Sequence, residues 1–246
     1  MNSNNPFLSV IIPAYNEANR IGDSLAAIVA YLRAQTFSSE LIIVNDGSRD
    51  ATAQIAQAKI TGVDQARLIS YTPNRGKGYA IRQGVLVARG ELVLFMDADL
   101  STPVSEIATA LDYFKQGCDM VIGSRALNQS RIAVYQPIYR RLGAKIFNLL
   151  RDGIVGAGIS RFKDTQCGFK IFRGAAARRI FNHTQIDRFM FDVEVLYLAL
   201  KWNYRIAEMP VQWADVRGSK VRLIRDTARM FKDLALIRLR HGKPGL

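Results

Sequence analysis

Five short apolar runs alternate with helix-like segments through the first half of this 246-residue sequence. The runs cover residues 7–12, 40–45, 66–71, 91–97 and 119–122. The segments between them, about 17–35, 50–59, 78–88 and 103–116, have the composition or the apolar period of helices. Strands and helices in alternation predict an α/β fold with a doubly wound, mostly parallel sheet and helices on both faces.

Four of the predicted strands end in polar residues that can take part in chemistry. The segments concerned are Pro13-Ala-Tyr-Asn-Glu17, Asn45-Asp46, Asp97 with Asp99, and Gly123-Ser-Arg125. The carboxyl ends of parallel strands meet at one edge of a sheet, which is where α/β proteins bind ligands. We therefore expect these residues to share one crevice.

Asp97 and Asp99 follow the fourth apolar run with one residue between them. A carboxylate at the end of a buried strand is costly unless it meets a cation or hydrogen-bond donors. We therefore expect Asp97 and Asp99 to form a metal site. A solvated turn is the alternative, with Ser101 or Thr102 as the N-cap of a helix and Pro103 at its first position. The turn accounts for Ser-Thr-Pro but leaves the two acids unexplained.

Several other classes of protein do not fit the sequence. The longest apolar runs are far shorter than the roughly 18–20 residues that span a bilayer, and the first residues do not form a signal-peptide pattern. Cys118 and Cys167 are the two cysteines, so we expect neither a zinc site nor a disulfide framework, and a reducing compartment. The sequence has no GxxxxGK[ST] motif and no GxGxxG after the first strand, which excludes the common nucleotide-binding loops.

The net charge of +13 is concentrated toward the C-terminus. Residues 220–246 hold eight basic and two acidic residues. Four of the basic residues fall on one helical stripe opposite an apolar face, namely Arg222, Arg225, Arg229 and Lys232. This pattern, and a similar one over 139–151, predicts an amphipathic helix on an anionic membrane surface, or else a surface helix that docks on the core. The tail lacks the interleaved aromatic side chains of a nucleic-acid groove, so we expect no nucleic-acid partner.

The apolar pattern of residues 191–202 predicts a helix that carries two acids, Asp192 and Glu194. Since buried acids need partners, we expect them to meet arginines or helix N-termini. Around this helix we expect an irregular loop over 128–136, a polar loop leading into a short strand over 163–172, a helix over 175–181 and an edge strand over 204–213.

Eight segments in order make the sequence resemble a known family. Five of them, which are Val10–Glu17, Val44–Ser48, Asn74–Gly78, Met96–Leu100 and Gly123–Arg125, resemble glycosyltransferase family 2, whose fold is the Rossmann-like GT-A fold. Three more resemble the dolichyl- or polyprenyl-phosphate β-glucosyltransferases of that family, namely Asp164–Lys170, Phe189–Glu194 and Pro210–Trp213 with Gly218-Ser-Lys220.

The resemblance implies a role for each matching residue. Nucleotide-sugar binding would fall to Pro13, Ala14, Tyr15, Glu17, Asp46, Lys77, Asp97, Ala98 and Asp99. The ligands of Mg²⁺ or Mn²⁺ would be Asp97, Asp99 and Ser101. The catalytic residues would be Asp97, Asp99 and Asp164. The acceptor phosphate would meet Arg125, Arg140, Arg141 and Lys220.

The implied activity is an inverting, metal-dependent transfer of glucose from UDP-glucose to a polyprenyl phosphate. A hard cation suits the charge that develops on the leaving nucleotide. The acceptor phosphate is largely a dianion at pH 7 and needs little deprotonation, so we expect Asp164 to position the sugar or a neighbouring cation rather than act as a strong base. GDP-mannose or another UDP-sugar remains an alternative donor, since Asn45 stands where relatives often have Asp. A non-catalytic nucleotide-sugar or lipid-phosphate binding protein is the alternative of another class.

The expected organisation is one GT-A domain over 1–219, with a nucleotide-sugar half (1–125) and an acceptor half (126–219), followed by a basic amphipathic helix over 220–246. We expect a cytoplasmic protein that associates peripherally with the cytoplasmic face of a membrane, and a homo-oligomer stays open.

Overall fold

The computed structural model describes residues 5–134, 148–149, 151–156, 158–215 and 223–242, with side chains of the last segment from Met230 onward. Most of the predicted helix over 139–151 lies outside these residues, although 148–149 and 151–155 are helical.

The first half of the chain alternates between strands and helices. The strands are β1 (Leu8–Ala14), β2 (Ser39–Asp46), β3 (Ala66–Tyr71), β4 (Leu92–Met96) and β5 (Met120–Ser124). The helices between them are α1 (Ile21–Arg33), α2 (Thr52–Ile60), α3 (Lys77–Val87) and α4 (Glu106–Lys115). All nine predicted elements are present, but α1 and α4 begin several residues later than expected.

The second half adds shorter elements. They are β6 (Arg131–Val134), the 3₁₀ helix η1 (Ile159–Arg161), β7 (Phe169–Arg173), α6 (Gly174–His183), α7 (Phe191–Lys201), β8 (Ile206–Pro210), β9 (Gln212–Ala214) and α8 (Leu223–His241). The predicted short strand, two helices, edge strand and C-terminal helix are therefore present.

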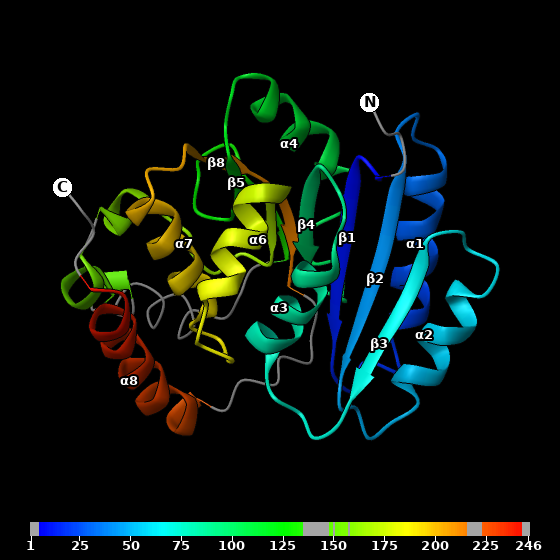
Figure 1. The fold of residues 1–246 in the computed structure, drawn as a ribbon, viewed down its shortest axis with the longest axis horizontal. Helices are drawn as coiled ribbons and strands as arrows, with labels where there is room; N and C mark the ends of the chain where they lie inside the picture. The colour runs from blue at the N-terminus through cyan, green and yellow to red at the C-terminus, as the bar shows by residue number, and fades with distance from the viewer. Residues whose placement is uncertain (1–4, 135–147, 150, 157, 216–222, 243–246) are drawn as a thin grey trace.

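A seven-stranded sheet with the order β3-β2-β1-β4-β7-β5-β8 forms the centre of the fold. Its strands are parallel except β7, which runs antiparallel between β4 and β5. The arrowheads of β1, β2 and β3 point to the same edge in Figure 1. The prediction of a mostly parallel sheet is confirmed, and β8 lies at an edge as expected.

Helices cover both faces of the sheet (Figure 1). One apolar core joins the sheet to α1, α2 and α4, and includes Leu25 and Phe114. The other joins it to α3, α6, α7 and the end of α8, and includes Phe95 and Tyr197. Strand residues alternate between the cores, as Val10 and Ile11 do, and burial of both faces explains the near-continuous apolar runs in the sequence.

The expectation of an irregular loop over 128–136 is wrong for residues 131–134. These residues form β6, which pairs in parallel with β9 in a separate two-stranded sheet. The partner strand lies about 80 residues away in the sequence, so no local sequence pattern predicts this pairing.

The C-terminal helix docks on the core through Leu234 and Ile237, both fully buried. Its exposed residues in this part include Lys232 and Leu239. Within the described residues, we find no helix both long enough and apolar enough to cross a membrane.

Candidate active site

The predicted site residues gather at the carboxyl edge of the sheet. Pro13 and Ala14 end β1, Asp46 ends β2, and Asp97 directly follows β4. The loop after β1 is tied to the loop after β2, since Asn16 N donates to Ser48 Oγ (2.9 Å) and Glu17 N donates to Thr52 Oγ1 (2.7 Å). Parallel strands thus bring these segments together as the sequence predicted.

Asp46 organises the loop between β3 and α3. Its carboxylate accepts hydrogen bonds from Asn74 Nδ2 (2.6 Å), Arg75 N (2.8 Å) and Gly76 N (2.8 Å). Gly76 has a φ of +114°, and a side chain there would collide with the carbonyl of Asp187. The loop that leads into Lys77 is therefore fixed from both sides, by Asp46 and by the segment before α7.

Lys77 and Asp97 form an ion pair at the centre of this edge. Lys77 Nζ lies 2.5 Å from Asp97 Oδ1, and about a third of the Asp97 side chain is exposed. Burial lowers the pKa of Lys77, but the carboxylates of Asp97 and Asp192 outweigh it and raise that pKa. Lys77 is therefore held in its protonated, positively charged form beside Asp97.

Gly168 leaves the space that the Asp97 carboxylate fills. A Cβ at Gly168 would lie 1.9 Å from Asp97 Oδ2, and Asp97 N donates to the Gly168 carbonyl (3.1 Å). This contact arises because the loop before β7 runs beside the end of β4. The residue type at 168 thus decides where Asp97 points.

Asp99 holds a tight turn after β4. Its Oδ1 accepts hydrogen bonds from Ser101 N (3.0 Å) and Ser101 Oγ (2.8 Å), and its Oδ2 lies 3.7 Å from Arg20 Nη1. Leu100 has a φ of +52°, which is unusual for a bulky residue and typical of constrained functional turns.

The alternative in which Ser101 or Thr102 caps a helix is wrong. Helix α4 begins at Glu106, and Ser101 turns its hydroxyl toward Asp99 instead. Val104 and Ser105 form a turn before the helix starts, in which Glu106 N donates to the Pro103 carbonyl (3.1 Å).

Arg20 is a site residue that the sequence analysis missed. It pairs with Glu17 and faces Asp99, and the hydrogen bond to Glu17 is the main cause that raises its pKa. It stands directly before α1, so it looks like an ordinary first-turn residue. Its place three positions after Glu17 is the only local signal for the pair.

Arg125 and Asp164 form a second ion pair, on the β5 side of the site. Arg125 Nε and Nη2 donate to the two Asp164 oxygens at 2.6 and 2.9 Å, and Arg125 N donates to Oδ2 at 3.0 Å. Burial raises the pKa of Asp164, but Arg125 outweighs it and the net shift is downward. Asp164 is therefore held as a carboxylate.

Two further groups hold the loop that carries Asp164. Glu208 accepts hydrogen bonds from Lys163 N (3.1 Å) and Asp164 N (2.9 Å). On the other side, the buried Arg151 donates to Thr165 Oγ1 (3.0 Å). The position of Asp164 is thus set by its backbone as well as by Arg125.

Asp192 and Glu194 both have partners, as expected, but these partners are neither arginines nor helix N-termini. Lys170 Nζ lies 2.5 Å from Asp192 Oδ1 and 2.7 Å from the Cys167 carbonyl. Glu194 accepts hydrogen bonds from the backbone N–H groups of residues 185 and 186, and lies 2.6 Å from His241 Nε2. A lysine inside the apolar strand 169–173 was the signal for the first pair.

The remaining predicted residues fall into three groups. Tyr15 directly follows β1 and is partly buried. Ala14 and Ala98 are buried in the apolar core, so their backbones rather than their side chains can face a ligand. Arg140, Arg141 and Lys220 lie outside the described residues.

The donor set at the carboxyl edge fits a hard divalent cation. Two carboxylates and the Ser101 hydroxyl offer oxygen ligands, which Mg²⁺ and Mn²⁺ prefer. Across the described residues, no group of three or more His, Cys, Asp or Glu side chains could hold a metal. Mg²⁺ commonly binds one or two carboxylates together with substrate phosphates, which matches a site of two acids.

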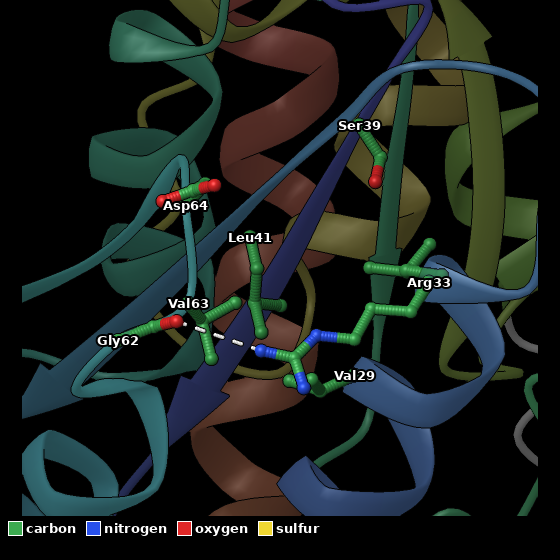
Figure 2. A pocket seen from close by; sticks show the side chains of 8 residues that line it. Val29, Arg33, Ser39, Leu41, Gly62, Val63 and Asp64 are labelled. Atoms are coloured by element: carbon green, nitrogen blue, oxygen red, sulfur yellow. Dashed lines mark hydrogen bonds between the residues drawn. The ribbon is translucent and has the colours of Figure 1, made fainter.

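A pocket at the opposite edge of the sheet is unsuited to this chemistry. It lies between the end of α1, the start of β2 and the loop before β3 (Figure 2). Its lining includes Val29, Leu41 and Val63, and Arg33 Nη2 spans part of it to the Gly62 carbonyl at 3.5 Å. The amino ends of the strands border this pocket, so it is remote from the acids at their carboxyl ends.

Comparisons with known proteins identify the family of the chain. The model of the family "Glycosyl transferase family 2" matches residues 9–182. Dolichyl-phosphate beta-glucosyltransferase of Dictyostelium discoideum is 38% identical over 96% of this chain and 75% of its own length. The human protein of that name is 36% identical over 95% of this chain and 75% of its own length.

Solved structures show the same fold at lower identity. Glucosyl-3-phosphoglycerate synthase from Mycobacterium tuberculosis, in complex with Mg²⁺ and UDP, gives a TM-score of 0.69 at 19% identity over 98% of this chain and 81% of that one. Mannosyl-3-phosphoglycerate synthase from Rubrobacter xylanophilus gives a TM-score of 0.68 at 20% identity, over 98% of this chain and 78% of that one. The family model, the near full-length relatives and the shared GT-A fold lead to one conclusion: the chain belongs to glycosyltransferase family 2.

Proposed function

We propose that the chain is a dolichyl- or polyprenyl-phosphate β-glucosyltransferase, which moves glucose from UDP-glucose to a lipid phosphate with inversion. The observation that carries the proposal is the alignment of relatives named dolichyl-phosphate beta-glucosyltransferase with 95–96% of the chain. The oxygen donors at the carboxyl edge, with cations close by, supply the groups that such a transfer needs.

The donor would bind along the ends of β1, β2 and β4. Pro13, Ala14, Tyr15, Glu17, Asp46, Lys77 and Ala98 would line the nucleotide-sugar side. Asp97, Asp99 and Ser101 would hold Mg²⁺ or Mn²⁺, which when bound stabilises the charge that develops on the leaving nucleotide. Arg20 and Lys77 add positive charge to the same edge.

The acceptor phosphate would approach from the β5 side, where Arg125 is held ready by Asp164. A guanidinium recognises a phosphate through charge-assisted hydrogen bonds. The Asp164 oxygens are occupied by Arg125, which supports a positioning role for this acid. Arg140, Arg141 and Lys220 would extend the cationic surface.

The lipid substrate requires the protein to work at a membrane surface. We assign donor binding to residues 1–125 and acceptor binding to 126–219 of one GT-A domain. The basic helix over 220–246 would attach the protein peripherally to the anionic cytoplasmic face of the membrane. Its net charge of +6, from eight basic and two acidic residues, supports that assignment.

The direct test is transfer of label from radioactive UDP-glucose to polyprenyl phosphate, with Mg²⁺, with Mn²⁺ or with EDTA. We expect lipid-extractable label that depends on the metal, and at least a 100-fold loss for Asp99→Asn, on the scale of removing a key electrostatic group. Asp112→Asn is the matched control, because Asp112 is an exposed acid on α4.

Each other outcome would overturn part of the proposal. Transfer from GDP-mannose in preference to UDP-glucose would replace the donor and keep the chemistry. Full activity in EDTA would show that the transfer does not depend on a metal. No transfer from any sugar nucleotide, by a protein that still binds UDP, would favour a binding protein over an enzyme.

A further inference from the structure

Four charged side chains of alternating sign lie in one row beneath the carboxyl edge, and we call them the charged row. In order they are Asp97, Lys77, Asp192 and Lys170. The two ends are direct ion pairs, with Lys77 Nζ 2.5 Å from Asp97 Oδ1 and Lys170 Nζ 2.5 Å from Asp192 Oδ1. Lys77 Nζ also lies 6.0 Å from the centre of the Phe191 ring, directly before Asp192, and the Asp192 carboxylate is one of the charges that raise the pKa of Lys77.

Four separate segments bring the charged row together, and the first of them is the loop after β4, which carries Asp97. Lys77 is the first residue of α3, Asp192 is the second residue of α7, and Lys170 lies on β7. The start of α3 packs directly on α7, since a Cβ at Gly78 would lie 2.6 Å from Phe191 Cβ. The row is therefore a product of close packing and not of one flexible loop.

Burial divides the charged row into an outer and an inner part. The side chains of Asp97 and Lys77 are 35% and 25% exposed, whereas those of Asp192 and Lys170 are 5% and 0% exposed. The inner pair is fixed by its surroundings, because Lys170 also donates to the Cys167 carbonyl. The outer pair faces the donor site, where a ligand can rearrange it.

Lys77 stands in the way of a metal ion at Asp97. A divalent cation that binds Asp97 Oδ1 would meet the Lys77 ammonium at the same oxygen, and two cations there repel each other. The ammonium must then leave Asp97. Asp192, on the residue after Phe191, is the second carboxylate whose charge acts on Lys77, and it offers the ammonium a new partner so that its charge is not left unpaired in a partly buried place.

We propose that Asp192 is a positioning residue that receives the Lys77 ammonium when a divalent metal binds at Asp97, and so holds Lys77 ready for the donor diphosphate. The inference rests on the proposed function, because it needs the metal at Asp97. Lys170 keeps Asp192 in place for this exchange. A purely structural role for the Lys170–Asp192 pair is the competing explanation.

The test uses the full-length protein and measures Mn²⁺ affinity by the EPR signal of free Mn²⁺, in the presence of saturating UDP. The central variant is Lys170→Met with Asp192→Asn, which removes the inner pair without changing the net charge or leaving a buried charge unpaired. The control is Lys115→Met with Asp112→Asn, an exposed pair of the same kind with a separation of 2.7 Å. Both double variants are also made on a Lys77→Met background.

We expect the central variant to weaken Mn²⁺ binding about tenfold, the usual size of coupling in a charge network, and the control to leave it within twofold. Lys77→Met alone should tighten Mn²⁺ binding when UDP is absent, because it removes the competing cation. On the Lys77→Met background, the central variant should change Mn²⁺ affinity less than twofold, because Asp192 acts through Lys77.

Two results would overturn the inference while leaving the proposed function intact. One is an equal loss of Mn²⁺ affinity from the central variant with and without Lys77, which would show a structural effect of the inner pair. The other is unchanged Mn²⁺ affinity in the folded central variant. Failure of the unmodified protein to bind Mn²⁺ with UDP would overturn both the inference and the proposed use of a metal.

Lys170→Gln with Asp192→Asn is a second route if the central variant unfolds. It leaves no buried charge unpaired, allows a hydrogen bond between the two side chains, and still removes the charge that would attract Lys77. The same comparison with and without Lys77→Met applies, with circular dichroism as the check on folding.

Discussion

Arg125 holds both oxygens of Asp164, with Nε and Nη2 donating at 2.6 and 2.9 Å. The two residues are 39 positions apart in the sequence, and 8% of the Asp164 side chain is exposed. The pair fixes a guanidinium at the edge of the site and leaves the carboxylate engaged. It therefore links stability to the proposed acceptor site, and both effects can be measured.

The first prediction concerns stability against pH. The pKa of Asp164 is lowered in the folded protein, so its stabilising effect is complete above the unfolded value, near about 4, and is lost as the pH falls through the folded pKa. Asp164→Asn should lower the free energy of unfolding by about 2 kcal/mol at pH 7, as expected for hydrogen bonds to charged groups. Urea denaturation should show a constant difference in the free energy of unfolding between the two proteins from pH 8 to about 5. The difference should become smaller below about pH 4. A gap that widens in acid would contradict the pairing.

The second prediction concerns recognition of the acceptor. Arg125→Lys keeps the charge but loses the fork that binds Asp164 through two nitrogens. We expect kcat/KM for the lipid phosphate to fall at least tenfold, equivalent to about 1.4 kcal/mol, with unchanged affinity for UDP. Lys115→Arg, at an exposed position, is the control for a basic exchange elsewhere. Equal loss of UDP affinity would place Arg125 at the donor instead.

The third prediction concerns Gly168. Gly168→Ala would force the Asp97 carboxylate to move, because the new Cβ would lie 1.9 Å from Oδ2. Mn²⁺ affinity with UDP should fall at least tenfold, within the range seen when the support of a metal ligand is lost. Gly153→Ala is the matched control, since no atom of the described residues outside its own helix lies within 4 Å of its Cβ position. Normal Mn²⁺ binding by a folded Gly168→Ala protein would show that Asp97 is not a ligand.

The fourth prediction concerns the attachment of α8. His241 Nε2 lies 2.6 Å from Glu194 Oε1 in a buried contact between α8 and α7. His241→Ala should lower the free energy of unfolding by roughly 1–3 kcal/mol, because it leaves a buried acceptor with one partner fewer. Hydrogen exchange at the end of α8 should accelerate, whereas Lys232→Ala on the exposed side should leave it unchanged. Equal exchange in both variants would mean that the His241–Glu194 contact does not hold the end of the helix.

The fifth prediction concerns membrane binding. Changing the basic stripe Arg222, Arg225, Arg229 and Lys232 to Glu should abolish sedimentation with anionic liposomes, because each basic residue contributes about 1 kcal/mol near such a surface. The control makes the same change in charge at exposed positions elsewhere, namely Arg33, Arg49, Lys59 and Lys115. An equal loss of sedimentation in both variants would mean that only the net charge matters. Unchanged sedimentation of the stripe variant would show that the basic stripe does not bind the membrane.

The position of the proposed donor residues at one edge of the sheet could largely be predicted from the sequence, because these residues follow strands whose patterns are local. Asp46 and Asp97 end up at one edge for the simple reason that β2 and β4 are parallel to β1. Arg20 was missed because an arginine at the start of a helix is usually a solvated residue. The wrong helix start after Pro103 has a similar origin, since Ser101 has a competing partner in Asp99 that a capping rule does not consider.

The sequence by itself determined the alternating α/β order, the polar strand ends and the basic C-terminal helix, because apolar period and strand length are properties of short segments. Tertiary structure alone decided that β7 enters the sheet antiparallel between β4 and β5. That one insertion places Gly168 against Asp97 and Lys170 beside Asp192. Such contacts depend on which distant segments bury each other best, and this balance is summed over the whole core and not written in any one stretch of chain.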